Sequence, residues 1–512
     1  MNSLLSIRTK HAFLTSTFLL ALAGQVQAQA TETAPAAPEA APAEPVAPVT
    51  APAPIEAAPA EAPSAVAPAP ATVAATTAPA PAPEPAPAPP PAPVVAVAAP
   101  VAPAAPAVPP LKVGASFMTR YEARAGALPV IGNRPLNADA IFYRARLSLM
   151  PAPVEFGEGM SSTVYFEPQS SGFYLVGGDP LQDIDLNLHQ GYLRLQAPCY
   201  TLDVGRFEMI YGDHLMIGNV GWNQTGRAFN GGRLHITPSG GTGAWLDLFA
   251  TLNNEGTALQ LDTIPLSDRN IGSLDHYLLG AYAGLGALVG AELDLYLLTK
   301  VWLGGTAPGM AGAQSVDPAA QLTFGARVKG AAGALDYRAE AGVQFGARKG
   351  GNNPTLQPVS VFAYQADAEL GVKPVKGLRL AAQGFIASGD DPETEDTVEA
   401  WDQHYPTAHK FLGLTDVFGG RSNVLGGAVH GSLAIGQSLQ ATVSGHLFTR
   451  PETPEGVDGY AGSEVDAGLA YALAPSTSFR GLYGVFLPNQ DGSFANDLPQ
   501  HFVEIELLHT IK

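Results

Sequence analysis

The chain has 512 residues, with 27 Lys and Arg against 46 Asp and Glu, and a formal net charge of −19. This acidic balance excludes nucleic acid as an expected partner, because nucleic-acid binding requires a basic surface. The single cysteine, Cys199, excludes a disulfide framework and any metal site built from paired cysteines.

The first thirty residues have the pattern of a secretory signal peptide. Arg8 and Lys10 supply positive charge, an apolar stretch follows at 13–24, and the triplet Ala-Gln-Ala at 28–30 fits the small-x-small cleavage rule. The alternative is a transmembrane anchor, but the apolar stretch is shorter than the ~20 residues that a spanning helix needs. We therefore expect residues 1–30 to be a cleaved signal peptide.

The next segment, residues 31–110, consists almost entirely of Ala, Pro, Val, Thr and Glu and has no aromatic residue. Such a composition cannot bury enough apolar surface to fold, so we predict a disordered Pro/Ala-rich linker. Its proline content favours extended polyproline II, which at ~3.1 Å per residue would reach roughly 250 Å. Two roles stay open for this linker. It is either a plain spacer or a tail that contacts the cell wall or periplasmic export machinery.

From residue 111 to the end, the sequence alternates between apolar and polar residues, with turns rich in Gly, Pro, Asn and Asp. In the stretch 335–345, apolar and aromatic residues hold one parity, while Asp336, Arg338 and Glu340 hold the other. The stretches 143–149, 289–297 and 362–370 follow the same rule. A period of two predicts β-strands whose two faces meet different environments.

A soluble sheet would alternate in the same way. Three features favour a membrane: apolar faces rich in Ala and Gly, strands that recur without an intervening helix pattern, and the expected signal peptide. Strands cross lipid only as a closed barrel, because every backbone polar group must be paired there. We therefore predict an all-β fold for 111–512, a transmembrane antiparallel β-barrel of about 18 strands. It would be in contact with the lipid of a Gram-negative outer membrane.

Turn signals place the starts of these strands, with an error of several residues. The expected starts lie near residues 112, 139, 160, 184, 199, 227, 243, 275, 288, 320, 334, 358, 377, 424, 437, 462, 476 and 500. A barrel of this size leaves an aqueous channel. Leu188 and Leu193 fall on opposite parities, which predicts a β-bulge near Gly191. Arg206 shares the parity of apolar neighbours, so either Gly205 is a bulge or the strand has left the bilayer there.

Two stretches carry more specific patterns. The first reads VGRFEMIYGD at 204–213 and WNQTGRAFNGGRL at 222–234. The second reads ASGDD at 387–391 and WDQHYPTAHKFLGLTD at 401–416. Both resemble the alginate-export family of outer-membrane barrels, although Trp401 stands where that family usually has Phe. The resemblance is expected over 112–512. It implies an eighteen-stranded monomer that passes an acidic polysaccharide through an Arg-lined constriction.

Arginine suits such a passage because its planar guanidinium pairs with carboxylates in a bidentate fashion and stays charged. The candidate pathway cations by strand parity are Arg120, Arg124, Arg144, Arg146, Arg194, Arg327, Lys329, Arg338 and Arg379, and the family motif adds Arg227 and Arg233. The same parity places carboxylates inside, among them Glu122, Asp247 and Glu340. The lumen is therefore expected to be mixed in charge, and a network of ion pairs that stiffens the wall is the alternative role for each Arg.

The stretch 389–422 has no strand pattern and is rich in Asp and Glu. Loops this long are usually functional or disordered, and the ordered motif favours a gate or plug at the extracellular mouth or inside the lumen. The motif residues assigned to such a loop or gate are Asp213, Trp222, Asp390, Asp402, Tyr405, His409, Lys410 and Asp416. The acidic cluster at 389–402 offers carboxylate oxygens, which Ca²⁺ prefers, but no EF-hand spacing is present. We predict no metal site, and calcium binding by this loop stays open.

The sequence also lacks the motifs of the common hydrolases and metalloproteases. It has neither a G-x-S-x-G elbow nor an H-E-x-x-H helix, and His404 and His409 have poor spacing for a metal. We expect no enzyme, no cofactor and no metal. The leading hypothesis is a passive outer-membrane channel for an acidic, alginate-like polysaccharide. The alternatives are a general or sugar-selective porin for uptake, and a structural barrel that tethers the outer membrane to the cell wall.

Overall fold

The computed structural model describes residues 110–126, 139–176, 183–238, 243–254, 276–286, 291–303, 305–306, 315–349, 358–391, 393–394, 396–490, 492 and 498–511. The expected signal peptide and all but the last residue of the Pro/Ala-rich linker lie outside these residues. Within the described part, no helix is both long and apolar enough to cross a membrane.

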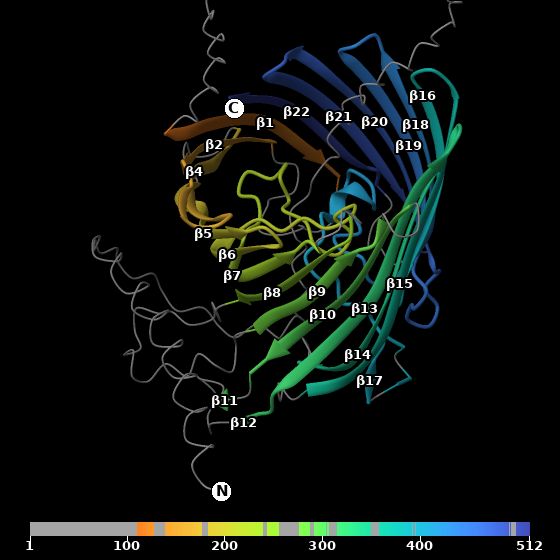
Figure 1. The fold of residues 1–512 in the computed structure, drawn as a ribbon. Helices are drawn as coiled ribbons and strands as arrows, with labels where there is room; N and C mark the ends of the chain where they lie inside the picture. The colour runs from red at the N-terminus through yellow and green to blue at the C-terminus, as the bar shows by residue number, and fades with distance from the viewer. Residues whose placement is uncertain are drawn as a thin grey trace, which may run out of the picture. The chain divides into compact units, whose positions relative to one another are not determined.

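The barrel wall consists of long antiparallel strands (Figure 1). They are β1 (Leu111–Ala125), β2 (Asp139–Pro151), β4 (Met160–Leu175), β5 (Asp183–Ala197), β6 (Tyr200–Phe207), β7 (Phe229–Ile236), β8 (Trp245–Asn254), β9 (His276–Gly284), β10 (Glu292–Trp302), β13 (Ala319–Ala332), β14 (Leu335–Lys349), β15 (Pro358–Val375), β16 (Leu378–Ala387), β18 (Val424–Ile435), β19 (Leu439–Thr449), β20 (Tyr460–Ala474), β21 (Thr477–Pro488) and β22 (Gln500–Ile511).

Four short strands and one helical turn complete the described elements. They are β3 (Val154–Gly157), β11 (Gly305–Thr306), β12 (Ser315–Val316), β17 (Thr397–Val398) and the 3-10 turn η3 (Ala408–Lys410). β3 pairs with β4, β17 pairs in parallel with β15, and β11 pairs only with β12.

The ring closes because the first wall strand pairs with the last one. Ala115 of β1 lies opposite Ile511 of β22, and the antiparallel register continues to Ala125 opposite His501. The wall is a closed barrel of 18 strands, which confirms the predicted fold class. Every wall strand begins within four residues of the start expected from the sequence.

The connections between strands have two lengths. The ends of β5 and β6, β13 and β14, and β15 and β16 are joined by short turns at the end of the barrel where β1 begins and β22 ends. Much longer connections join β6 to β7 and β16 to β18 at the opposite end. Outer-membrane barrels place short turns in the periplasm and long loops outside. We name the two ends of this barrel periplasmic and extracellular accordingly.

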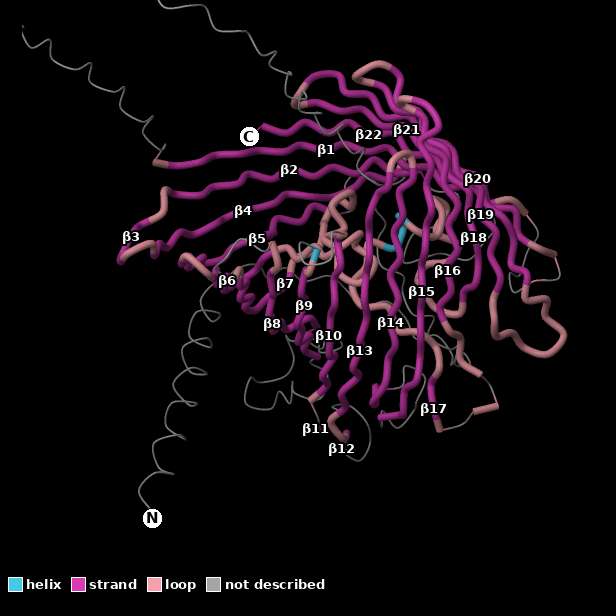
Figure 2. Tube along the Cα trace, turned by 45° about the vertical axis from the view of Figure 1, so that its right-hand side comes forward, coloured by secondary structure: helices cyan, strands magenta, loops and turns pink. Residues whose placement is uncertain are grey.

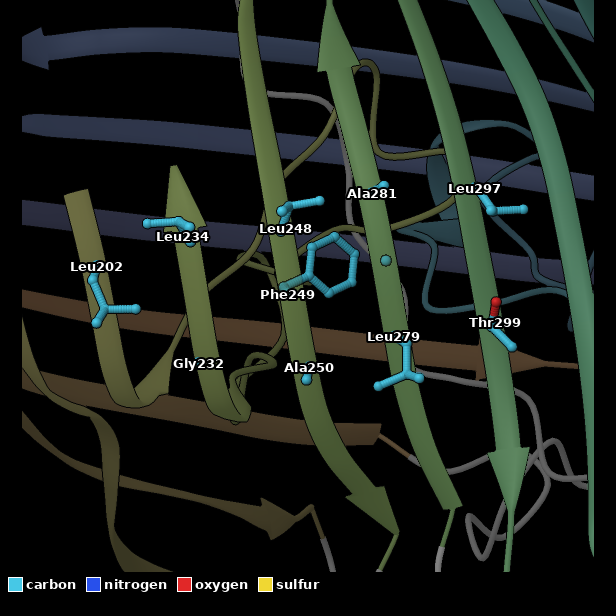
Figure 3. Close-up of a pocket in the computed structure, with 11 residues that line it drawn as sticks. Leu202, Gly232, Leu234, Leu248, Phe249, Ala250, Leu279, Ala281, Leu297 and Thr299 are labelled. Atoms are coloured by element: carbon cyan, nitrogen blue, oxygen red, sulfur yellow. The ribbon is translucent and has the colours of Figure 1, made fainter. Parts of the chain in front are cut away.

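The two faces of the wall differ as the alternation predicts. Large apolar side chains such as Phe362, Val429 and Leu447 are exposed on the outer face, each by about 60%. Inward positions carry buried polar side chains such as Gln344. An apolar groove of about 470 Å³ lies near Leu248, Leu279 and Leu297 (Figure 3). Each of these three side chains is about two-fifths exposed. This groove belongs to the outer, lipid-facing surface and not to the lumen.

The bulge predicted near Gly191 is present. Glu167 of β4 pairs with Gln190 and the next residue, Pro168, pairs with Leu188, so His189 is the extra residue in β5. Gly205 keeps the regular register with both neighbouring strands and forms no bulge there. The outward Arg206 is instead the last but one residue of β6, where it donates to the carbonyl of His189.

Candidate channel and its inner loops

Two loops from the extracellular end fold into the barrel. The β6–β7 loop comprises residues 208–228, and the β16–β18 loop comprises residues 388–423, including β17 and η3. Figures 1 and 2 show the β6–β7 loop and much of the β16–β18 loop inside the ring of strands, whereas β17 lies beside β15 at the edge of the wall. The second loop was expected at the extracellular mouth or in the lumen. For the first loop, the motif marked Asp213 and Trp222 as loop or gate residues but did not say where the loop lies.

The two loops pair with each other through their backbones. Ile217 and Tyr405 form a parallel β-bridge. The amide of Gly218 donates to the carbonyl of Tyr405 at 2.8 Å, and the amide of Tyr405 donates to the carbonyl of Met216 at 2.9 Å. A third bond joins the amide of Thr407 to the carbonyl of His214 at 2.9 Å. The two motif segments therefore form one unit, although 188 positions separate Ile217 from Tyr405.

This unit has a hydrophobic core inside the barrel. Met209, Ile217 and Phe411 from the loops pack in the same cluster as the inward side chains of Phe385 and Phe448. Each of these five side chains is at most 3% exposed. An eighteen-stranded barrel was expected to hold an aqueous channel, but part of this lumen is packed with protein instead. The loops supply the apolar partners that the wall alone could not provide.

Charged wall residues fix the β6–β7 loop. Asp213 accepts a hydrogen bond from Arg327 Nε at 2.9 Å and lies 3.4 Å from Lys329 Nζ. Arg120 donates to the carbonyl of Trp222 at 2.6 Å, and Arg144 donates to the carbonyl of Asn223 at 2.6 Å. Burial opposes the ionisation of Asp213, but Arg327 and Lys329 offset it and hold the pKa at about 2. The loop carboxylate therefore stays charged and docked.

A second set of contacts fixes the β16–β18 loop at Asp402. Its carboxylate accepts from Lys300 Nζ at 2.7 Å and from Gln321 Nε2 at 3.1 Å. Its backbone exchanges two hydrogen bonds with the side-chain amide of Gln344. Burial opposes the ionisation of Asp402, but the Lys300 ammonium holds its pKa below the usual range. This loop is thus attached to β10, β13 and β14 at once.

Two further motif residues, Tyr405 and His404, extend this attachment. The ring nitrogen of His276 and the hydroxyl of Tyr405 lie 2.7 Å apart, and His404 Nε2 lies 2.7 Å from Thr323 Oγ1. Burial, aided by the nearby Lys300, lowers the pKa of His404 to about 3. His404 is therefore neutral in the docked loop at neutral pH.

The end of the same loop contacts β1 and the other loop. Arg124 donates to the carboxylate of Asp416 at 3.0 Å, and Asp416 also pairs with His409 Nδ1 at 2.8 Å. The ring of His409 stacks on Trp222, with centroids 5.1 Å apart. Arg120 covers Trp222 with its guanidinium 4.1 Å from the ring centroid. Trp222 therefore joins the two loops and the wall.

Backbone strain is concentrated in these loops. Among the described residues, the non-glycine positions with positive φ are His214 (68°), Val220 (50°), Asp416 (57°) and Asn423 (47°), and all four lie in the two loops. Val220 is β-branched, so this conformation is unusual for it. Such positions persist only where surrounding contacts over-determine them, and they cluster at functional sites. The docked loop conformation thus depends on the wall contacts described above.

The other candidate pathway cations pair mainly with wall carboxylates. Asp203 accepts from Arg194 Nε at 2.7 Å and from Arg233 Nη2 at 2.8 Å. Arg379 pairs with Asp336 and Glu369, and Arg338 pairs with Glu369 and Asp367. Within the loops, Arg227 donates to the carbonyl of Pro406 at 2.9 Å. Arg146 lies 3.4 Å from Glu208.

Some motif residues have a more peripheral place. Asp390 is exposed and accepts from the amide of Glu399, and Lys410 is exposed with its ammonium 5.7 Å from the ring of Phe411. Within the described residues, no group of three or more His, Cys, Asp or Glu is arranged to hold a metal ion. Sequence reasoning missed Lys300, which shares the inward parity of Asp294 and Tyr296, and it missed Arg421, which binds Asp367 at 2.6 Å.

A closed antiparallel barrel with an apolar outer face and a charged lumen defines the chain as a β-barrel channel of the outer membrane. Residues 291–476 match the family model described as alginate export, so the family resemblance drawn from the motifs is confirmed over this stretch. The stretch is shorter than the expected 112–512 and contains the second motif segment but not the first. It matches a family of channels, in agreement with the expectation that the chain is not an enzyme.

Solved structures share the fold. The match to Pseudomonas aeruginosa OccK11 (OpdR) has a TM-score of 0.52 and 10% identity and covers 78% of this chain and 96% of that one. OccK9 (OpdG) from the same organism matches with a TM-score of 0.54 and 12% identity, over 78% of this chain and 98% of that one. OccK2 (OpdF) from the same organism, in complex with glucuronate, matches with a TM-score of 0.53 and 11% identity, over 78% of this chain and 98% of that one. No curated protein matches the chain in sequence.

Proposed function

We propose that this channel passes an acidic, alginate-like polysaccharide across the outer membrane by passive diffusion. The observation that carries the proposal is a set of cations on the periplasmic part of the wall that are still open to the lumen. The side chains of Arg194, Arg379 and Lys329 are 32%, 30% and 38% exposed. Arg120 and Arg327, which hold the inner loops, are at most 4% exposed. The match to the alginate-export family model supports the same substrate class.

The chemistry of a uronate polymer fits this wall. Each sugar carries one carboxylate, which an arginine can pair in a bidentate fashion. The wall carboxylates weaken the attraction most at Arg379, which pairs with Asp336 and Glu369, and less at Arg194 and Arg233, which share the single carboxylate of Asp203. A polymer that is bound weakly at many positions can still move, whereas a purely cationic wall would hold it.

The inner loops would act as the gate. In the described conformation they are bonded to each other and to the wall, so a polymer can pass only after part of this unit moves. The bonds of Asp402 and Asp213 to the wall are polar and reversible, unlike the strand pairing of the barrel itself. We therefore assign the gating role to the docking of these two loops.

The test is conductance of the purified full chain in planar bilayers. We expect an anion-selective current that uronate oligomers block, while neutral oligosaccharides of the same length block it weakly. A cation-selective current without uronate block would overturn the proposal. The chain without residues 31–110 serves as the control and should conduct normally. A weakened cell envelope caused by that deletion would favour the tethering role instead.

A second candidate is uptake of small acidic solutes. The inner loops fill part of the lumen while docked, and one structural relative, OccK2, is described in complex with glucuronate. Liposome swelling separates the two functions. Rapid swelling in glucuronate, without block by uronate oligomers, would favour uptake over polymer export.

A further inference from the structure

A hollow of about 320 Å³ lies in the inner wall near the periplasmic end. It is lined from β1, β2, β4 and β22, and its inward lining residues include Lys112, Ser116, Arg146, Ser148, Tyr165 and Thr510. None of these residues belongs to the inner loops. The hollow lies near the periplasmic ends of strands β1, β2 and β4. Its volume falls within the range of small-ligand sites, about 300–1,000 Å³.

Small side chains create the hollow. Gly114 of β1 lies opposite Ser148 of β2, and Ser116 lies between Arg146 on one side and Thr510 on the other. Three neighbouring strands thus present glycine or a short hydroxyl side chain at adjoining inward positions. Elsewhere on the wall, inward positions carry long side chains that pair across strands, such as Arg379 with Asp336.

One side of the hollow is aromatic. The ring of Tyr165 lines it and stacks on Tyr192 of β5, with centroids 5.3 Å apart and an interplanar angle of 27°. The Tyr165 hydroxyl donates to Glu167 at 2.7 Å, which fixes the ring. Arg194 lies on the other side of this pair, 5.3 Å from the Tyr192 ring. Tyr165 and Tyr192 are only partly buried.

Most of the remaining lining groups suit a sugar acid, and the carboxylate of Glu167, which also lines the hollow, accepts the hydroxyl of Tyr165. Ser116, Ser148 and Thr510 can exchange hydrogen bonds with sugar hydroxyls. The exposed Lys112 is a cation at the edge of the hollow, whereas the guanidinium of Arg146 is bonded to Gln169 and Glu208. An aromatic ring offers an apolar face to the C–H face of a pyranose, as it does to other apolar surfaces. The hollow thus combines a suitable volume, hydroxyl groups, a cation and an aromatic ring.

We propose that this hollow is a saccharide subsite that binds one uronate unit of a chain entering from the periplasm. The inference rests on the proposed function and names the place where that substrate first engages the wall. Tyr165 supplies the stacking surface, and Lys112 pairs with the carboxylate.

The experiment measures how long a uronate trisaccharide blocks single channels when it is added from the periplasmic side. Tyr165→Ala should shorten the block roughly tenfold, whereas Tyr165→Phe, which keeps the ring, should change it less than about twofold. Ser116→Leu fills the hollow without touching the aromatic pair and should also shorten the block. Lys112→Gln should slow capture of the uronate trisaccharide and leave that of a neutral one unchanged.

Tyr200→Ala is the matched control, since Tyr200 lies near the same end of the barrel but is exposed on the outer face. Heat-modifiable migration on a gel checks that each variant has folded. If the trisaccharide blocks the Tyr165→Ala and Ser116→Leu variants for as long as it blocks the unmodified channel, the proposed subsite is wrong, while the proposed function stands. If no uronate block occurs in the unmodified channel, the proposed function itself fails.

Discussion

The part of the lumen that the inner loops contact and the part next to the short turns use the same residue types in different ways. Where the β6–β7 loop packs against the wall, inward cations such as Arg120 and Arg327 are buried. Near the short turns, Arg194 and Arg379 pair with wall carboxylates and keep about a third of their side-chain surface open to the lumen. Strand parity points all four inward. Whether an inward arginine holds a loop or faces a substrate is decided by what folds against it.

The largest expected effect follows from releasing the β16–β18 loop. Asp402→Ala removes the carboxylate that neutralises Lys300, whose side chain is only 8% exposed. Removing one partner of a buried ion pair costs about 3 kcal/mol or more, and the partial exposure of Asp402 lowers this to roughly 2 kcal/mol. We expect the loop to undock much more often, with long high-conductance openings in single-channel records.

The control for this prediction is Asp390→Ala, which removes an exposed carboxylate from the same loop. It should leave the openings unchanged. The paired replacement of Lys300 by Met and Asp402 by Leu should restore much of the docking, because no buried charge is left alone. Identical current records for Asp402→Ala and the unmodified channel would show that the loop is held by other contacts.

Acid should act on the same unit with a smaller effect. Burial, with Lys300 nearby, lowers the pKa of His404 to about 3, and burial, with Lys410 nearby, lowers that of His214 to about 4. In an undocked loop both would titrate near 6.5. Docking is therefore fully stable above pH 6.5 and weakens as the pH falls, by up to tenfold per pH unit for each histidine until its docked pKa is reached.

Open probability measured between pH 7 and pH 4 tests this, and it should rise steadily toward pH 4. His404→Gln keeps a group that can bond to Thr323 but cannot take a proton, so its curve should be shallower. Asp213, whose pKa is held at about 2, adds to the loss of docking only below about pH 4. A flat response between pH 6.5 and pH 4 would contradict the role assigned to the histidines.

The wall could be predicted from the sequence because its rule is local. Each strand alternates and each turn is marked by Gly, Pro or Asp, so strand starts were placed within four residues. The loop contacts follow no local rule. Asp402 meets Lys300 across 102 positions, and Asp213 meets Arg327 across 114. The motif identified both aspartates as special, but only the fold shows that they attach loops to the wall.

The two charged residues that the sequence analysis missed differ in how predictable they were. Lys300 could have been predicted, because it continues the inward parity of Asp294 and Tyr296 along β10. Arg421 could not, because it lies in a loop without periodicity and finds Asp367 only in three dimensions. Parity therefore predicts a direction for strand residues and nothing for loop residues.

The smallest expected effect concerns the periplasmic part of the lumen. Asp203→Asn removes the one carboxylate that Arg194 and Arg233 share, while an amide oxygen remains to accept a hydrogen bond. The two arginines then carry an unbalanced positive charge that faces the lumen. We expect the ratio of anion to cation permeability to rise by roughly twofold, without a change in open probability, because no inner loop is bonded to Asp203. The reversal potential in a salt gradient measures this ratio. A shift toward cations, or a change in gating instead of selectivity, would mean that the two parts of the lumen do not differ as the structure indicates.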